Sequence, residues 1–92
     1  MCKINNLHDF GVGFTVNQED MLECQKEYTM TLKADAPGKS IEIEFTIVII
    51  EITEDNGKRK CRALYRDMTE EQLAALEEIL LAQPKKLYAS IA

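Results

Sequence analysis

The stretch from Ser40 to Thr53 is the feature that most limits how this chain folds. It reads SIEIEFTIVIIEIT, is rich in β-branched residues and contains neither Gly nor Pro, which is typical of a long β-strand. Apolar and polar residues alternate as far as Ile47, and the apolar run then continues without a break to Ile50. A strand that is apolar on both faces is usually central in a sheet and covered on both sides. We therefore expect the rest of the chain to pack around this strand.

A first turn signal precedes the long strand. Pro37 and Gly38 suit the two central positions of a type II turn. They predict a hairpin between a strand near residues 26–34 and the strand at 40–53. Counting outward from the turn gives every apolar residue an apolar partner, which supports this register. The predicted pairs are Ala34 with Ile41, Leu32 with Ile43, Met30 with Phe45, Tyr28 with Ile47, Lys33 with Glu42 and Thr31 with Glu44.

A second turn signal follows it. Asn56 and Gly57 are typical of a type I′ turn and predict a hairpin with a strand near residues 58–67. Counting outward now puts even-numbered residues of the long strand on the core face, whereas the first hairpin uses odd-numbered ones. Either a β-bulge near residues 48–50 shifts the phase, or the strand is regular and its two ends bury opposite faces. The predicted pairs are Ile52 with Cys61, Ile50 with Ala63, Val48 with Tyr65, Thr53 with Lys60 and Glu51 with Arg62.

The clearest helix signal lies near the C-terminal end. The run Thr69-Glu70-Glu71-Gln72 matches a capping box, with Thr69 as the N-cap and Gln72 at the third helical position. The helix is predicted from Glu70 to about Ala82, and Pro84 follows its end. One face is apolar and packs inward, while Leu81 lies off that face. The residues of the apolar face are Leu73, Leu76, Ile79 and Leu80.

The N-terminal part gives weaker signals. Residues 10–16, FGVGFTV, alternate bulky residues with Gly or Thr, which predicts a strand that adds to the sheet or covers one of its edges. Asn17 could cap a short helix, with an irregular turn as the alternative. Residues 1–9 are predicted to form a flexible arm and residues 84–92 a C-terminal tail.

Together these elements predict one α+β domain over residues 1–92. Its expected fold is an antiparallel β-meander of three or four strands, with the C-terminal helix packed on one face. The order of three strands followed by a helix is similar to that of a double-stranded-RNA-binding domain. That family has a basic helix start, whereas this helix opens with Glu70 and Glu71, so we assign the chain to no family.

Charge and cysteine usage narrow the classes of function. The chain has 92 residues and a formal net charge of −5, which argues against a broad surface for nucleic acid or for an anionic membrane. Its three cysteines show no C-x-x-C spacing, so we expect neither a disulfide framework nor a zinc site. The start, MCKINNLHDF, does not resemble a signal peptide, and no apolar run is long enough to span a bilayer. A cytoplasmic protein is the resulting prediction.

No set of residues indicates catalysis. Glu42 and Glu44 share a strand face, and the helix carries further glutamates, but all of them are expected to be solvated. His8, the sole histidine, lies in the predicted arm and has no nucleophile motif beside it. No metal-binding spacing occurs either. We therefore predict no enzymatic activity, no cofactor and no metal.

The basic run after the second turn has two interpretations. It consists of Lys58, Arg59, Lys60, Arg62 and Arg66. In the first interpretation, these side chains pair with nearby acids and protect an edge strand from aggregation. In the second, they form a site for an acidic partner or a phosphate backbone. The first is favoured because the run is short and has only Tyr65 beside it for stacking.

The surplus of apolar surface suggests a function. One helix cannot cover both faces of the long strand, so we predict a non-enzymatic protein-binding module that forms a homodimer through its sheet. The alternative is a small phage-type antagonist that occupies the basic nucleic-acid-binding site of a partner enzyme, and a third class is a small-molecule- or nucleotide-binding enzyme subunit. Direct nucleic-acid binding is not expected. The predicted partner-binding residues are Ile47, Ile49, Leu64, Lys60, Arg62 and Arg66.

Overall fold

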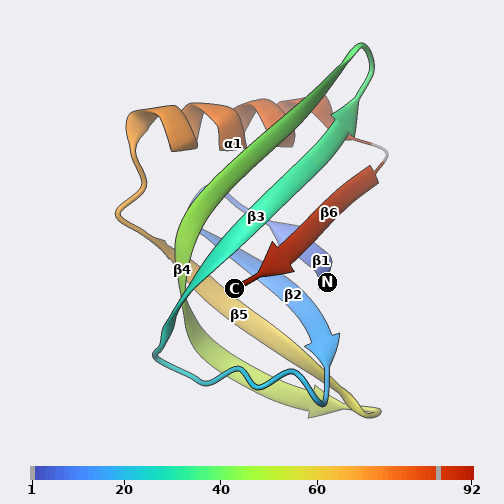
Figure 1. Ribbon diagram of the computed structural model, residues 1–92, viewed down its shortest axis with the longest axis vertical. Coiled ribbons are helices and arrows are strands. Elements are labelled where there is room, and N and C mark those ends of the chain that lie inside the picture. Colours follow the sequence, from blue (N-terminus) through green and yellow to red (C-terminus); the bar gives the residue numbers. More distant parts are fainter. Residues whose placement is uncertain (1, 85) are drawn as a thin grey trace.

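A computed structural model describes residues 2–84 and 86–92 and places them in six strands and one helix (Figure 1). All strand pairs are antiparallel, and the order across the sheet is β1-β2-β5-β4-β3-β6. The helix α1 lies across the top of the sheet and passes behind β3 and β4 in the view of Figure 1. The elements are β1 (Lys3–Leu7), β2 (Gly11–Asn17), β3 (Glu27–Ala36), β4 (Lys39–Asp55), β5 (Lys58–Arg66), α1 (Glu70–Ala82) and β6 (Lys86–Ile91).

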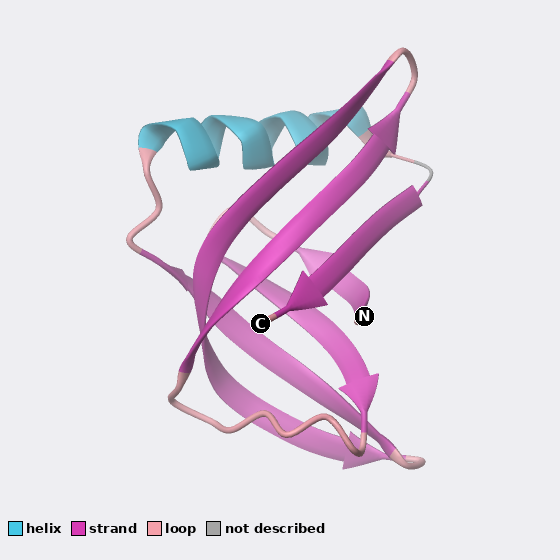
Figure 2. Cartoon of the chain, in the orientation of Figure 1, coloured by secondary structure: helices cyan, strands magenta, loops and turns pink. Residues whose placement is uncertain are grey.

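The sheet curls until its two outer strands meet. The backbone amide of Cys2 donates a hydrogen bond to the carbonyl oxygen of Ala89 at 3.1 Å, which joins the β1 side to β6. The sheet is therefore nearly a closed barrel, and strands make up most of the chain (Figure 2). The predicted meander of three or four strands with a helix on one face is therefore wrong. The curled sheet covers most of the inner face of the long strand, and α1 packs against the rest of β4.

The two ends of the chain contribute strands, contrary to the prediction of a flexible arm and a tail. β1 pairs with β2, but its register shifts between Ile4 and Asn6, which breaks the alternation that would have revealed it. β6 pairs along β3 and points Ala89 into the core. Met1 and Lys85, which the predicted arm and tail also contain, lie outside the described residues.

The first hairpin is confirmed in every predicted pair. Met30 lies opposite Phe45 and Leu32 lies opposite Ile43, and all four of these side chains are buried. Gly38 has a φ of 82°, the conformation that the third position of a type II turn requires. The turn chemistry and the apolar pairing thus indicate the same register, which is why local sequence was sufficient here.

The second hairpin contains a bulge, which is the first of the two alternatives left open by the sequence. Ile49 pairs with Ala63 and Glu51 pairs with Arg62, so Ile50 is the extra residue on β4. The bulge keeps Ile47, Ile49 and Ile52 turned to the interior and leaves Ile50 outside. The alternative of a regular strand with two buried faces is wrong. Ile52 with Cys61, Thr53 with Lys60 and Glu51 with Arg62 pair as predicted, whereas Ile50 with Ala63 and Val48 with Tyr65 do not.

The helix is built as the capping box predicts. The backbone amide of Gln72 donates to Thr69 Oγ1 at 3.1 Å, and the amide of Thr69 donates to Gln72 Oε1 at 2.8 Å. Leu76 and Ile79 enter the core, while Leu81 stays exposed. Gln83 ends the helix in the left-handed conformation. Across residues 2–84 and 86–92, no helix has the length and apolar character to cross a bilayer.

The connection between β2 and β3 is an irregular loop rather than a short helix (Figure 2). Backbone hydrogen bonds of Gln25 and Lys26 with Ile49 hold it against the barrel, and two bonds that involve side chains add to them. The Arg59 guanidinium donates to the carbonyl oxygen of Asp20 at 2.9 Å, and the amide of Glu23 donates to the Tyr28 hydroxyl at 2.9 Å. The loop closes the lower end of the barrel, as α1 closes the upper end.

Candidate protein-binding surface

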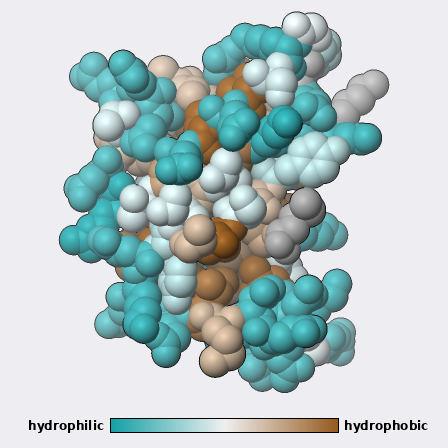
Figure 3. All heavy atoms as spheres, in the orientation of Figure 1, coloured by the Kyte–Doolittle hydropathy of each residue, from teal (hydrophilic) through white to brown (hydrophobic). Residues whose placement is uncertain are grey.

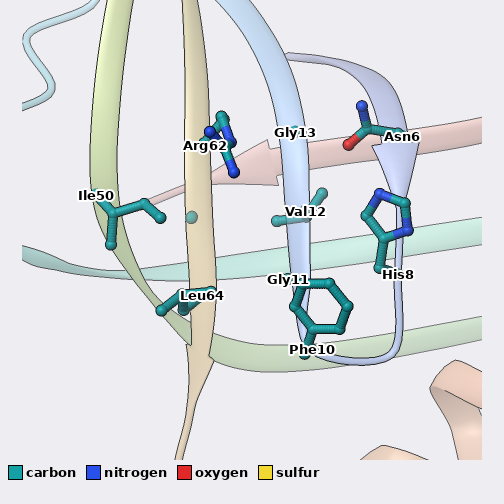
Figure 4. A pocket seen from close by; sticks show the side chains of 10 residues that line it. Asn6, His8, Phe10, Gly11, Val12, Gly13, Ile50, Arg62 and Leu64 are labelled. Carbon is teal, nitrogen blue, oxygen red and sulfur yellow. The ribbon is translucent and has the colours of Figure 1, made fainter.

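A shallow hollow lies on the outer side of β2, between β1 and β5 (Figure 4). Gly11 and Gly13 turn outward on β2, so backbone rather than side chains forms its floor. Its volume is about 240 Å³. Polar side chains from β1 and β5 stand over one end, and apolar side chains stand around the other. The lining residues with outward side chains are Asn6, His8, Phe10, Ile50, Arg62 and Leu64.

The two glycines are required for different reasons. A Cβ on Gly11 would lie 2.6 Å from the carbonyl oxygen of Ala63, a backbone atom of the neighbouring strand. A Cβ on Gly13 would lie 2.5 Å from Oδ1 of Asn6, which is the end of a flexible side chain. β2 and β5 therefore approach closely at Gly11, whereas the Asn6 carboxamide covers Gly13. Both glycines are buried, because the Leu64 side chain also lies 3.4 Å from the Cβ position of Gly11.

Three large apolar side chains border the Gly11 end of the hollow. Phe10 is 67% exposed, Ile50 is 44% exposed and Leu64 is 42% exposed. The imidazole of His8 stacks on the Phe10 ring, with centroids 5.6 Å apart and planes at 10°. We call Phe10, Ile50 and Leu64, with the floor at Gly11, the Gly11 patch. It comes from three strands or their ends, so the whole sheet positions it.

Tyr65 fixes the turn that carries Phe10. Its hydroxyl lies 2.6 Å from the carbonyl oxygen of His8 and 2.9 Å from that of Gly11. Burial, together with the negative charge of Asp9, raises the pKa of Tyr65 above its ordinary value, although the hydrogen bond to His8 opposes this. The phenol therefore stays protonated and keeps its role as a donor. The edge of the Gly11 patch is held in place by the core.

Three of the five basic residues of β5 are paired with acids of β4 or β3. Lys60 Nζ lies 3.3 Å from Asp55, Arg62 Nη1 lies 3.6 Å from Glu51, and Arg66 Nε lies 2.8 Å from Glu27. For these three residues this agrees with the interpretation that they pair with nearby acids, whereas Arg59 donates to the carbonyl oxygen of Asp20. The edge-protection part of that interpretation is wrong, because β5 lies between β2 and β4. Beside the Gly11 patch, a row of bases on β5 runs next to a row of acids on β4.

The structure separates the predicted partner-binding residues into two groups. Leu64, Lys60, Arg62 and Arg66 are exposed on the outer face of β5. Ile47 and Ile49 are wholly buried in the barrel, since the bulge turns them inward. They cannot form part of a contact surface while the barrel is intact, and this part of the prediction is corrected.

Sequence reasoning missed two members of the Gly11 patch. Phe10 was expected on the same face as Val12 and Phe14, but β2 begins after it and its ring lies outside. Ile50 was expected opposite Ala63, and its outward position follows from the bulge. The proposal of a bulge near residues 48–50 was the available signal for Ile50. No signal in the sequence marked Phe10.

A second hollow of about 230 Å³ lies at the seam between the chain ends. Hydrophobic atoms gather along the middle of the face shown in Figure 3, between hydrophilic flanks. Met21, which lines the hollow, is 87% exposed, and burial raises the pKa of the Cys2 thiol from 9.0 to about 11. The residues around this hollow are Cys2, Val16, Asp20, Met21, Leu22 and Ile91. Within the part of the chain that the structure describes, no three His, Cys, Asp or Glu residues are grouped to hold a metal ion.

Comparison of the chain with protein-family models, with curated proteins and with solved structures found no match. Function has to be inferred from the surface alone. On that basis, the Gly11 patch is the strongest candidate, because it combines exposed apolar side chains, a concave floor and a polar rim.

Proposed function

We propose that this protein is a non-enzymatic protein-binding module that self-associates through the outer face of β2, β5 and β4. The observation that carries the proposal is the Gly11 patch, in which Phe10, Ile50 and Leu64 are exposed around one hollow. Exposed apolar residues that gather in one place commonly mark an interaction site. A cluster of apolar residues that includes an aromatic ring, with charged residues at the rim, is also the composition of a protein interface.

The charges beside the patch suit a second copy of the same chain. Lys60 and Arg62 form the basic row on β5, and Glu51 and Asp55 form the acidic row on β4. A two-fold axis that runs along the strands between these rows places the basic row of one copy opposite the acidic row of the other. The same rotation sets the Leu64 side of one copy against the Ile50 side of the other. Such self-complementarity is what a two-fold interface requires.

The size of the hollow favours a protein contact over a small-molecule site. Its volume of about 240 Å³ lies below the roughly 300–1,000 Å³ that is usual for small-molecule pockets. A flat contact across three strands uses the exposed side chains, whereas a small ligand would leave most of them in water. The antagonist alternative and the enzyme-subunit alternative stay predictions, and no feature of the Gly11 patch favours either.

Sedimentation of the purified protein over a range of concentrations tests the proposal. We expect the wild-type protein to sediment as a dimer and Leu64→Asp to sediment as a monomer, because a buried carboxylate without a partner opposes association. Leu64 is exposed, so the variant is expected to keep its fold, which circular dichroism checks.

Met21→Asp provides the matched control. It adds the same charge at an exposed apolar residue beyond the other end of β2. It should leave the dimer intact. A wild-type monomer at high concentration would overturn self-association, and a dimer that is lost in Met21→Asp but kept in Leu64→Asp would move the interface to the seam hollow.

A further inference from the structure

A different groove separates the β1–β2 turn from the C-terminal half of α1. In Figure 1 the connection from β1 to β2 passes beneath the helix. The groove has a volume of about 440 Å³, larger than the hollow at Gly11. Its lining residues are Leu7, His8, Asp9, Glu77, Leu80 and Leu81. We call it the helix groove, and its use does not depend on self-association through the Gly11 patch.

The apolar part of the helix groove is incompletely covered. Leu7 and Leu80 are half-buried against the core, and Leu81 is 83% exposed at the end of the helix. Leu81 lies off the inward face that Leu76 and Ile79 occupy. An apolar side chain placed between the turn and the helix would contact all three leucines and remove them from water. This gives the groove an apolar floor that is open to a partner.

The charge of the groove has one sign. Asp9 and Glu77 stand on its two sides, and among the described residues that line it there is neither Lys nor Arg. Among the described residues neither acid has an ion-pair partner, whereas Glu27, Glu51 and Glu78 each have one. The groove also lies at the C-terminal end of α1, the negative end of the helix dipole, and the last turn carries no basic residue. The two carboxylates and the negative end of the helix dipole together favour a cationic group in the groove.

We propose that the helix groove binds a segment of another protein in which a large apolar side chain is flanked by lysine or arginine. The apolar side chain packs on Leu7, Leu80 and Leu81. The flanking cations pair with Asp9 on the turn and Glu77 on the helix. The net charge of −5 on the whole chain attracts the same kind of partner over a longer range.

Fluorescence anisotropy with a pair of labelled peptides tests the proposal. The probe is a leucine–lysine amphipathic peptide, and its twin carries glutamate at every lysine position. We expect the intact protein to bind the lysine peptide and not the glutamate twin, with affinity falling as salt rises. The double variant Asp9→Asn, Glu77→Gln should weaken binding by roughly tenfold, which corresponds to the loss of two exposed ion pairs.

Two control variants distinguish binding in the helix groove from nonspecific attraction of a basic peptide to an acidic protein. Asp35→Asn, Glu54→Gln makes the same change of charge at exposed acids elsewhere on the sheet, and its binding should match that of the wild type. Leu81→Ser removes an exposed side chain without changing charge, and it should weaken the binding that persists at high salt.

Three results would overturn the proposal. The first is absence of binding to the lysine peptide, and the second is equal weakening in the two double variants, which indicates diffuse attraction. The third is a smaller sedimenting mass for Leu81→Ser than for the wild type, which means that a second copy of this chain occupies the groove. Circular dichroism on each variant confirms that the barrel is intact.

Discussion

The ring of Phe45 meets the ring of Tyr65 edge-on, with centroids 5.2 Å apart and planes at 89°. Phe45 is almost fully buried on β4, and Tyr65 reaches from this contact to the carbonyl oxygens of the β1–β2 turn. One side chain thus connects the centre of the core to the turn that carries Phe10. The geometry of the Gly11 patch depends on this connection.

Tyr65→Phe should lower the free energy of unfolding by about 1 kcal/mol, the usual net value of one such hydrogen bond. The ring contact with Phe45 is kept, so the change isolates the hydroxyl. Urea denaturation measures the loss, and hydrogen exchange should rise in residues 8–11. An unchanged midpoint together with unchanged exchange would show that the turn is held without Tyr65.

The same hydroxyl predicts a pH dependence. Because burial raises the pKa of Tyr65 in the fold above its ordinary value of 10.0, the unfolded chain releases this proton first. The stabilisation is complete below pH 10 and is lost as the pH rises above it toward the higher pKa of the folded state. Free energies of unfolding measured from neutral to alkaline pH should therefore fall more steeply for the wild type than for Tyr65→Phe. Parallel curves would contradict the buried phenol.

Gly11→Ala should cost more stability than Gly13→Ala. The added methyl group at Gly11 meets the Ala63 carbonyl oxygen, which cannot move without separating β2 from β5. Overpacking of this kind costs about 1–3 kcal/mol. At Gly13 the obstacle is the Asn6 side chain, which can rotate away. Denaturation of both variants checks the order, and Asn6→Ala should rescue Gly13→Ala but not Gly11→Ala.

Deletion of Ile50 should be tolerated. Without it, Ile49 is followed directly by Glu51, so inward and outward residues alternate and the pairs with Ala63 and Arg62 are kept. Deletion of Glu44 is the control, since it turns Phe45 outward and the strand has no bulge there to compensate. Far-ultraviolet circular dichroism and thermal melting should show a folded protein in the first case alone. A folded Glu44 deletion would mean that the register of β4 can slip.

Thr69→Ala should destabilise the protein by about 1 kcal/mol, as the loss of an N-cap does. The Thr69 side chain is exposed and accepts a hydrogen bond from the backbone amide of Gln72, so the change removes the cap without opening a cavity. Thr69→Ser keeps the hydroxyl and serves as the control. Equal denaturation midpoints for all three proteins would contradict a role for the cap.

Local sequence predicted the parts of this fold that local chemistry decides. The Pro37-Gly38 turn, the register of β3 on β4 and the Thr69 cap all follow from residues that are close in the chain. The pairing of β6 with β3, and of Cys2 with Ala89, joins segments that are far apart in the chain and leaves only a short, irregular apolar pattern. The prediction therefore missed the closure of the sheet.

The candidate site was predicted only in part, because local alternation determines some of its residues but not the phase of β4. Leu64 and Arg62 follow from simple alternation on β5, and both lie on the outer face. Ile47 and Ile49 were expected at the surface because the phase of β4 could be kept or shifted, and sequence left both alternatives open. The bulge at Ile50 determines which residues of β4 face inward. It leaves Ile50 at the surface and buries Ile47 and Ile49.

The pairing of β3 with β6 also has a consequence for how the chain folds as it leaves the ribosome. β3 and β4 can form their hairpin early, but the other edge of β3 has no partner until β5, α1 and β6 have been synthesised. Because synthesis proceeds at about 5–20 residues per second, this edge of β3 stays unpaired for on the order of seconds. During that interval β3 is a template for pairing with another nascent chain. When many ribosomes synthesise this protein close together, the risk of aggregation is therefore expected to rise. A chaperone that binds extended strands would act before β6 is synthesised.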